Sequence, residues 1–164
     1  MIFISVYIES EKNSNRKYIY NHNDFLLHLE TILSYPFFFP YAYGFIPNTL
    51  SNNGREMNAL VVSDHNYRLA SLIQAFVIGA LVLDTKTGKE TTIICLTGPD
   101  YEKQKCLDIF QLPMDILKNI EWFFKYHRKG SKIDRFVARH EACEWVFKSM
   151  QEFTHNAPFE DIPL

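Results

Sequence analysis

The side chains best suited to chemistry in this chain are basic ones that follow a predicted helix. Lys125, Arg128, Lys129 and Lys132 lie close together in the sequence. The planar guanidinium of Arg128 could bind two oxygens of one phosphate group. The same charges could instead form a solvated helix end, which the helix dipole favours. The pattern alone leaves both interpretations open.

Histidine and cysteine patterns argue against several other kinds of site. Neither a Ser/His/Asp order nor a Cys/His nucleophile pair has specific support. The cysteines are odd in number and far apart, which argues against a disulfide framework or a zinc knuckle and favours a reduced, cytoplasmic setting. They are Cys95, Cys106 and Cys143. Five histidines show no pairing at metal-ligand spacing and are predicted to be surface or core residues, namely His22, His28, His65, His140 and His155.

The composition is that of a globular protein. The 164 residues are 47% hydrophobic and 22% charged, and the formal net charge is −2. One domain over residues 1–164 is expected from this length. The small net charge predicts no global field that would recruit nucleic acid or an anionic membrane. The amino terminus does not resemble a secretory signal, and no apolar run reaches the roughly 18 residues of a membrane span. We therefore expect neither nucleic acid nor a membrane as a partner.

Short β-rich segments separated by polar turns precede the basic cluster. Residues 73–83 and 91–96 are apolar runs joined by the polar turn 84–89, which predicts a β-hairpin. Residues 25–33 fit a helix or a strand by pattern alone. Further strands are predicted at 2–8, 18–20 and 59–62, with a polar turn at 11–16.

An aromatic block at residues 35–47 contains three prolines, which exclude a regular helix. Extended chain and turns are expected there. Asn52-Asn53-Gly54 follows as a strong turn signal, because Asn and Gly tolerate the positive φ values that tight turns demand.

Two later segments have apolar residues at helical spacing. Leu112-Pro113 opens the first, and a proline suits the first turn of a helix. The second covers residues 140–153 and carries Ala142, Val146 and Met150 on one face. Strands first and helices last indicate an α+β domain, with a barrel or curled sheet flanked by two carboxy-terminal helices.

The segment from Phe39 to Gly54, FPYAYGFIPNTLSNNG, resembles the tyrosine-proline, tyrosine-glycine and Asn/Asp-glycine region of family I inorganic pyrophosphatases. The likeness continues through Val77 to Leu81, the turn at Gly88, the Leu112-Pro113 helix opening and the run from Phe123 to Arg128. Shared order and spacing from about Phe37 to Arg128 carry the resemblance.

This resemblance implies a five-stranded barrel of the oligonucleotide/oligosaccharide-binding type with flanking helices. It also implies magnesium-dependent hydrolysis of pyrophosphate to two phosphates, in the cytoplasm, by a homo-oligomer. Several Mg²⁺ ions would neutralise the substrate, activate a water and stabilise the leaving phosphate. Such hard cations prefer oxygen ligands, charged ones above all.

The expected metal-binding turn departs from the family pattern. Family members carry Asp-Gly-Asp-Pro-x-Asp, whereas the matching residues here are Asn53-Gly54-Arg55-Glu56-Met57-Asn58. Asn53 and Asn58 keep an oxygen without the charge, and Arg55 introduces a cation. Because the glycine is kept, we expect the turn itself to survive.

The next hairpin of the family carries two more metal-binding aspartates and a phosphate-binding lysine. Alignment on Gly88 places Thr85 and Glu90 at the aspartates and Thr92 at the lysine, with Asp84 one residue away. Asp84 and Glu90 are thus candidate ligands for Mg²⁺, together with Asn53 and Asn58. Both acids could instead be solvated turn residues. Adjacent strand residues face opposite ways, so Asp84 could serve only in a rearranged turn.

Candidate phosphate-binding residues come from the same alignment. The expected catalytic residues are Lys17, Tyr43 and Arg128, and the expected substrate contacts also include Arg55 and His127. Tyr43 could donate a hydrogen bond to phosphate or serve a structural role. The other family positions fall at Tyr7 for the first glutamate, Ile19 for the second, Thr31 for the arginine and Phe39 for the first tyrosine.

Two hypotheses about function follow from these departures. In the first, an active enzyme rebuilds its magnesium site from Asp84, Glu90 and Glu56. In the second, hydrolysis is weakened or lost, and the protein binds phosphate or a nucleotide through Lys17, Arg55 and Arg128.

Overall fold

The computed structural model describes residues 2–156, so the ends of the predicted 1–164 domain lie outside the described residues. The described chain forms eight strands, three α-helices and one 3-10 helix, η1. The strands are β1 (Phe3–Ser10), β2 (Arg16–Asn21), β3 (Leu26–Ile32), β4 (Ala42–Ile46), β5 (Met57–Val61), β6 (Leu72–Thr85), β7 (Gly88–Leu96) and β8 (Lys132–Ala138). The helices are α1 (Gly98–Gln104), η1 (Ile109–Gln111), α2 (Met114–Tyr126) and α3 (Arg139–Asn156).

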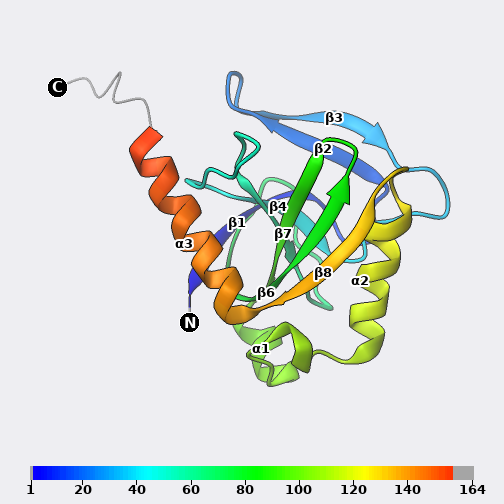
Figure 1. The fold of residues 1–164 in the computed structure, drawn as a ribbon. Coiled ribbons are helices and arrows are strands. Elements are labelled where there is room, and N and C mark those ends of the chain that lie inside the picture. The colour runs from blue at the N-terminus through cyan, green and yellow to red at the C-terminus, as the bar shows by residue number, and fades with distance from the viewer. Residues whose placement is uncertain (1, 157–164) are drawn as a thin grey trace.

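Five strands close into a barrel, as predicted. The main sheet has the order β1-β4-β5-β7-β6-β8, and β1 also pairs with β6, which joins the two sides of the sheet (Figure 1). β5 and β7 run parallel, and the other pairs are antiparallel. Strand β8 adds to β6 outside the closed ring. Closure leaves the β1–β6 edge paired rather than exposed.

The predicted hairpin of β6 and β7 is confirmed. Thr85 faces Gly88 across a tight turn, and Gly88 has φ +125°, a value that other residues rarely adopt. Leu83 pairs with Glu90, and Asp84 pairs with Lys89. Neighbouring side chains on these strands therefore point to opposite faces of the sheet.

Each face of the sheet packs against a different helix. On one face, Ala80 and Val82 of β6 belong to the same buried cluster as Val146 of α3. On the other face, Leu81 and Leu83 belong to the cluster that contains Ile120, Phe123 and Phe124 of α2. The barrel wall is thus buried on both sides here, and α2 and α3 are the two predicted carboxy-terminal helices.

The ambiguous segment 25–33 is a strand. β3 pairs with β2 in a separate two-stranded sheet that lies across one end of the barrel (Figure 1). β8 and α1 had no counterpart in the predictions. In β8 only Val137 is buried, so the strand has no clear alternating pattern. α1 has seven residues and is too short to show helical periodicity.

No helix in the described part of the chain is both long and apolar enough to cross a bilayer.

Candidate functional site

A pocket of about 390 Å³ lies where the β2–β3 hairpin meets the barrel and the carboxy-terminal end of α2. We call it the phosphate pocket, after the ligand that the family resemblance implies. The structure brings all but one of the predicted site residues to its wall. These are Lys17, Tyr43, Asn53, Arg55, Asn58, Glu90, His127 and Arg128. The exception is Asp84.

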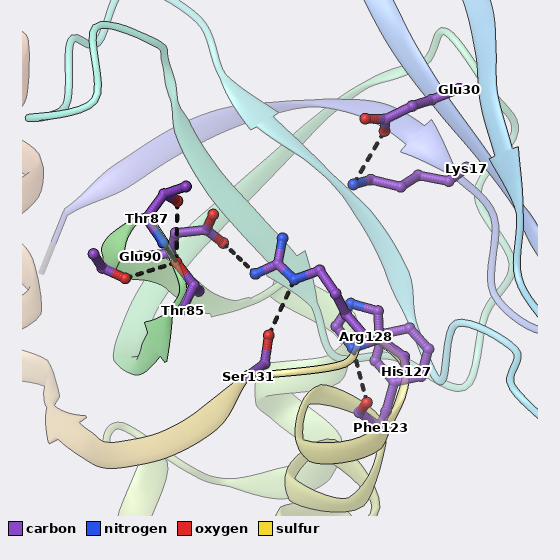
Figure 2. A network of polar contacts seen from close by, with 10 residues as sticks. Lys17, Glu30, Thr85, Thr87, Glu90, Phe123, His127, Arg128 and Ser131 are labelled. Carbon is purple, nitrogen blue, oxygen red and sulfur yellow. Dashed lines mark hydrogen bonds and ion pairs between the residues drawn. The ribbon is translucent and has the colours of Figure 1, made fainter.

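Arg128 is anchored at the end of α2 by two side chains (Figure 2). Its Nη2 lies 2.9 Å from Oε2 of Glu90, and its Nε donates to Oγ of Ser131 at 3.0 Å. Glu90 comes from β7, so the ion pair ties the barrel to the segment after α2. The charge of Glu90, a predicted metal ligand, is therefore already balanced by a cation.

Two other carboxylates of the pocket also have basic partners. Lys17 Nζ lies 3.1 Å from Oε2 of Glu30 across the β2–β3 hairpin (Figure 2). His22 Nε2 lies 2.5 Å from Oε1 of Glu56. His22 is an exposed surface residue, as predicted, and it also lines the pocket. Sequence reasoning missed Glu30, because the strand pairing that brings it to Lys17 is a tertiary feature.

Glu9 is the buried carboxylate of the pocket. Its Oε2 accepts a hydrogen bond of 2.8 Å from the backbone N–H of Tyr20. Burial, and next the negative charge of Glu56, raise the pKa of Glu9 to about 7, against the opposing backbone hydrogen bond and Lys17. The acid that β1 supplies to the pocket is thus Glu9, whereas Tyr7 packs against Tyr20 and Phe45. One signal could have identified it, because Glu9 is the sole acid of β1.

Replacement of Glu9 by Gln should change the pH dependence of stability. From pH 4.5 to 7 the folded chain keeps a proton on Glu9 that the unfolded chain has released, so stability falls as pH rises through this window. The shift from 4.5 to about 7 corresponds to roughly 3 kcal/mol. We expect the free energy of unfolding of Glu9→Gln, relative to wild type, to be higher at pH 8 than at pH 4 by about this amount.

Denaturant unfolding of both proteins at the two pH values measures this difference. Glu121→Gln, at an exposed position of α2, removes the same charge without the burial and should show no such change. His127 contributes with the opposite sign, because burial lowers its pKa to about 4 and its unfolded form takes up the proton first as pH falls. A relative stability of Glu9→Gln that is equal at both pH values would contradict the assignment.

His127 is held as a neutral ring. Its Nδ1 donates to the carbonyl oxygen of Phe123 at 2.9 Å, and the ring stacks on Phe123 with centroids 4.5 Å apart. Burial first, and then the charges of Arg128 and Lys17, lower its pKa. A neutral ring with Nδ1 occupied presents Nε2 as an acceptor. His127 can therefore accept a hydrogen bond from a protonated phosphate oxygen.

Tyr43 faces the charged groups of the pocket from β4. Burial, and then the negative charges of Glu9 and Glu90, raise the pKa of its hydroxyl. Its ring stacks on that of Phe39, with centroids 5.6 Å apart. The hydroxyl thus stays protonated and is available as a donor.

The turn that carries Asn53 and Arg55 survives, as expected. Oδ1 of Asn53 accepts hydrogen bonds from Oγ of Ser51 at 2.6 Å and from the backbone N–H of Arg55 at 3.0 Å. Gly54 adopts φ +79°. The amide oxygen of Asn53 therefore serves the turn rather than pointing freely into the pocket.

Asp84 lies on the wrong side of the hairpin for the phosphate pocket. Its Oδ1 accepts from Nζ of Lys89 at 2.7 Å, whereas its neighbour Leu83 lines the pocket. The alternation of side chains along β6 explains this difference. The turn is not rearranged in this structure: Asp84 pairs with Lys89, and Thr85 Oγ1 donates to the carbonyl oxygen of Gly88 in a tight hairpin.

The donor set does not fit a magnesium centre. Within residues 2–156, no group of three or more His, Cys, Asp or Glu side chains is arranged to hold a metal ion. Glu30, Glu56 and Glu90 each lie beside a basic side chain instead. A cluster of several Mg²⁺ ions needs more free carboxylate oxygens than this wall offers.

Comparisons with known proteins identify the family. The family described as inorganic pyrophosphatase matches residues 6–154. An inorganic pyrophosphatase of Nanoarchaeum equitans is 33% identical over 158 residues, which cover 91% of this chain and 96% of the relative. One from Saccharolobus solfataricus is 27% identical over 157 residues and 90% of each chain.

Solved structures of inorganic pyrophosphatases share the fold of this chain. The inorganic pyrophosphatase of Helicobacter pylori superposes with a TM-score of 0.87 at 27% identity, covering 93% of this chain and 94% of that chain. The enzyme of Thermus thermophilus shares the fold with a TM-score of 0.88 at 24% identity, covering 93% and 91%. The fold and the sequence match point to one family along nearly the whole described chain. The chain therefore belongs to the inorganic pyrophosphatase family.

Proposed function

We propose that this protein binds pyrophosphate or phosphate in the phosphate pocket, and that its magnesium-dependent hydrolysis of pyrophosphate is strongly weakened or lost. The observation that carries the proposal is the pairing of Glu30, Glu56 and Glu90 with basic side chains. Asn53, Arg55 and Asn58 stand beside them where the family resemblance expects aspartates.

Electrostatic interactions explain why the rate of magnesium-dependent hydrolysis should be low. Two unit charges 4 Å apart interact by about 4 kcal/mol even at an effective dielectric near 20. Each aspartate that is replaced by Asn removes one such attraction for a metal ion, and Arg55 adds a repulsion. We infer that Mg²⁺ binds this wall weakly, so a metal-activated water is rarely formed.

Binding of the anion can proceed through the chain's own cations. Lys17, Arg55 and Arg128 line one pocket, and Tyr43 adds a neutral donor. Arg128 uses Nη2 and Nε in its contacts with Glu90 and Ser131, which leaves Nη1 for a phosphate oxygen. The carboxylates compete with the ligand for these cations, so we expect modest affinity rather than tight binding.

A second candidate function is residual hydrolysis at a rebuilt magnesium site. One observation favours it, because Glu56 and Glu90 line the same pocket and Glu9 lies in its wall. Asp84, the third acid of that hypothesis, lies outside the pocket. Phosphate release from magnesium pyrophosphate that disappears in Glu90→Gln would support this function over the first.

Calorimetry with pyrophosphate tests the proposal. We expect wild type to bind pyrophosphate in EDTA, and Arg128→Gln to bind it about 10- to 100-fold more weakly, because a charge-assisted hydrogen bond contributes about 1.5–3 kcal/mol. Arg68→Gln removes an exposed guanidinium outside the pocket and should leave the affinity unchanged. Binding that requires Mg²⁺, or equal loss in both variants, would contradict the proposal.

We also propose a cytoplasmic homo-oligomer, on the basis of the family resemblance and the exposed apolar side chains. Phe25, Leu26, Leu29 and Ile32 of the β2–β3 hairpin are all more than half exposed. Such a patch is typical of an interaction surface. Sedimentation of the purified protein would measure the oligomeric state.

A further inference from the structure

A second cavity, of about 410 Å³, adjoins the phosphate pocket. It lies between the turn after β4, the β7 strand and helix α3. Asn53, Glu56, Asn58 and Glu90 line both cavities, so the two meet around these four residues. Each volume lies in the range of about 300–1,000 Å³ that small-molecule sites occupy. A ligand could therefore place one part in each cavity.

Flat groups form one wall of the second cavity. The guanidinium of Arg135 lies over the indole of Trp145, with its carbon 5.7 Å from the ring centroid. Glu141 holds the guanidinium through Nη1 at 3.4 Å and Nη2 at 3.2 Å. We call this pair the Arg135–Trp145 platform. Nucleobases stack on both Arg and Trp planes, largely without regard to base identity.

The remaining wall combines apolar and basic side chains. Leu50, Met57 and Val82 contribute apolar surface, and Lys89 and Lys148 contribute positive charge. This mixture fits an organic group attached to an anion better than it fits an inorganic anion alone. The acids Asp134 and Glu152 also line the cavity, and Lys89 lies 3.1 Å from Asp134.

We propose that the ligand of this protein is a nucleoside diphosphate or triphosphate. This inference rests on the proposed function, because its terminal phosphates occupy the phosphate pocket. Its base lies against the Arg135–Trp145 platform, and its sugar lies between the cavities.

The residues at the junction suit a sugar better than a phosphate. The neutral amide of Asn58 can bond to hydroxyl groups, and Asn53, whose oxygen is held in the turn, can donate to them through its amide nitrogen. Glu56 and Glu90 would repel a phosphate there, but each is held by a basic partner on the side of the phosphate pocket. The geometry thus places the negative charge beside Lys17 and Arg128 and the uncharged part of the ligand beside the amides.

Calorimetry with ADP and with pyrophosphate, both in EDTA, tests the inference on the full chain. We expect ADP to bind at least about 10-fold more tightly than pyrophosphate, as one stacked base allows. Trp145→Leu should remove this preference and leave pyrophosphate affinity within about twofold. Arg135→Gln, at a half-exposed position, provides a second variant with less risk to the core and should also weaken ADP alone.

Control variants distinguish nucleotide binding from the proposed binding of pyrophosphate. Trp122→Leu, at an exposed tryptophan of α2 outside both cavities, should leave both affinities unchanged. In a Trp122→Phe background, ADP and not pyrophosphate should quench the fluorescence of Trp145. Pyrophosphate binding without a preference for ADP overturns the nucleotide inference and leaves the proposed function intact. Failure of both ligands to bind overturns the proposed function and the inference together.

Discussion

The variant Asn53→Asp/Arg55→Asp/Asn58→Asp is expected to hydrolyse magnesium pyrophosphate at least about 100-fold faster than wild type. The substitutions shift the charge of the turn by four units, one from each asparagine and two from the arginine. A 100-fold gain requires about 2.7 kcal/mol of transition-state stabilisation. One carboxylate 4 Å from a unit charge supplies about 4 kcal/mol at an effective dielectric near 20. Three new carboxylates can therefore supply the gain even if most of the attraction is lost to solvation.

The turn should tolerate these changes. Asp at position 53 keeps the oxygen that accepts from Ser51 Oγ and from the backbone N–H of residue 55. Gly54 retains its positive φ, and the side chains of Arg55 and Asn58 face the pocket. We therefore expect little loss of folding stability, because no buried apolar contact is removed.

Phosphate release measured against Mg²⁺ concentration is the readout. The matched control is Asn66→Asp/Arg68→Asp, which makes the same types of change on an exposed segment outside the pocket and should leave the rate at the wild-type level. If wild type already hydrolyses pyrophosphate as fast as the variant, the pocket binds its metals without these carboxylates. That result would refute the electrostatic argument for lost activity.

Local patterns predicted four of the five barrel strands, and the fifth, β4, lies in the segment that was predicted as extended chain and turns. The polar turn between two apolar runs predicted the β6–β7 hairpin. The alternation of side chains along a strand also indicated, correctly, that Asp84 faces away from Glu90. The proline and the apolar spacing predicted α2. These features depend on neighbours in sequence. β8 was missed because it covers the barrel with a single buried residue, Val137.

The composition of the site could be predicted only in part. Arg55 and Glu90, which were aligned on glycine-marked turns, both lie at the wall of the phosphate pocket, and their roles there stay predictions. Glu9 was missed because the alignment placed the first glutamate of the family at Tyr7, although Glu9 is the sole acid of β1. Between Ile8 and Ser10, β1 shifts its register against β4. The ion pairs that hold Glu30 and Glu56 join segments distant in sequence. Lys17 was predicted as a site residue, but its pairing with Glu30 and the pairing of His22 with Glu56 depend on how the β2–β3 hairpin packs.

Gly44→Ala is expected to destabilise the fold by about 3–5 kcal/mol, a large part of the 5–15 kcal/mol typical of a domain. A Cβ at this position of β4 would overlap the carbonyl oxygen of Tyr7 and lie 2.8 Å from its carbonyl carbon and 3.1 Å from Cα of Ile8. All three atoms belong to the backbone of β1, so no side-chain rotation relieves the clash. The strands must separate, although they pair at Ile8 and Gly44 to close the barrel.

Denaturant unfolding of this variant is best compared with Gly98→Ala. Gly98 has open space around its Cβ position and no positive φ, so its replacement should change stability by less than about 0.5 kcal/mol. A Gly44→Ala midpoint equal to that of wild type would show that β1 can move aside freely. The close contact between Gly44 and the β1 backbone also fixes the positions of two pocket residues, because Glu9 follows Ile8 on β1 and Tyr43 precedes Gly44 on β4. Any Gly44→Ala protein that still folds should therefore bind pyrophosphate more weakly, since separation of the strands moves two walls of the phosphate pocket apart.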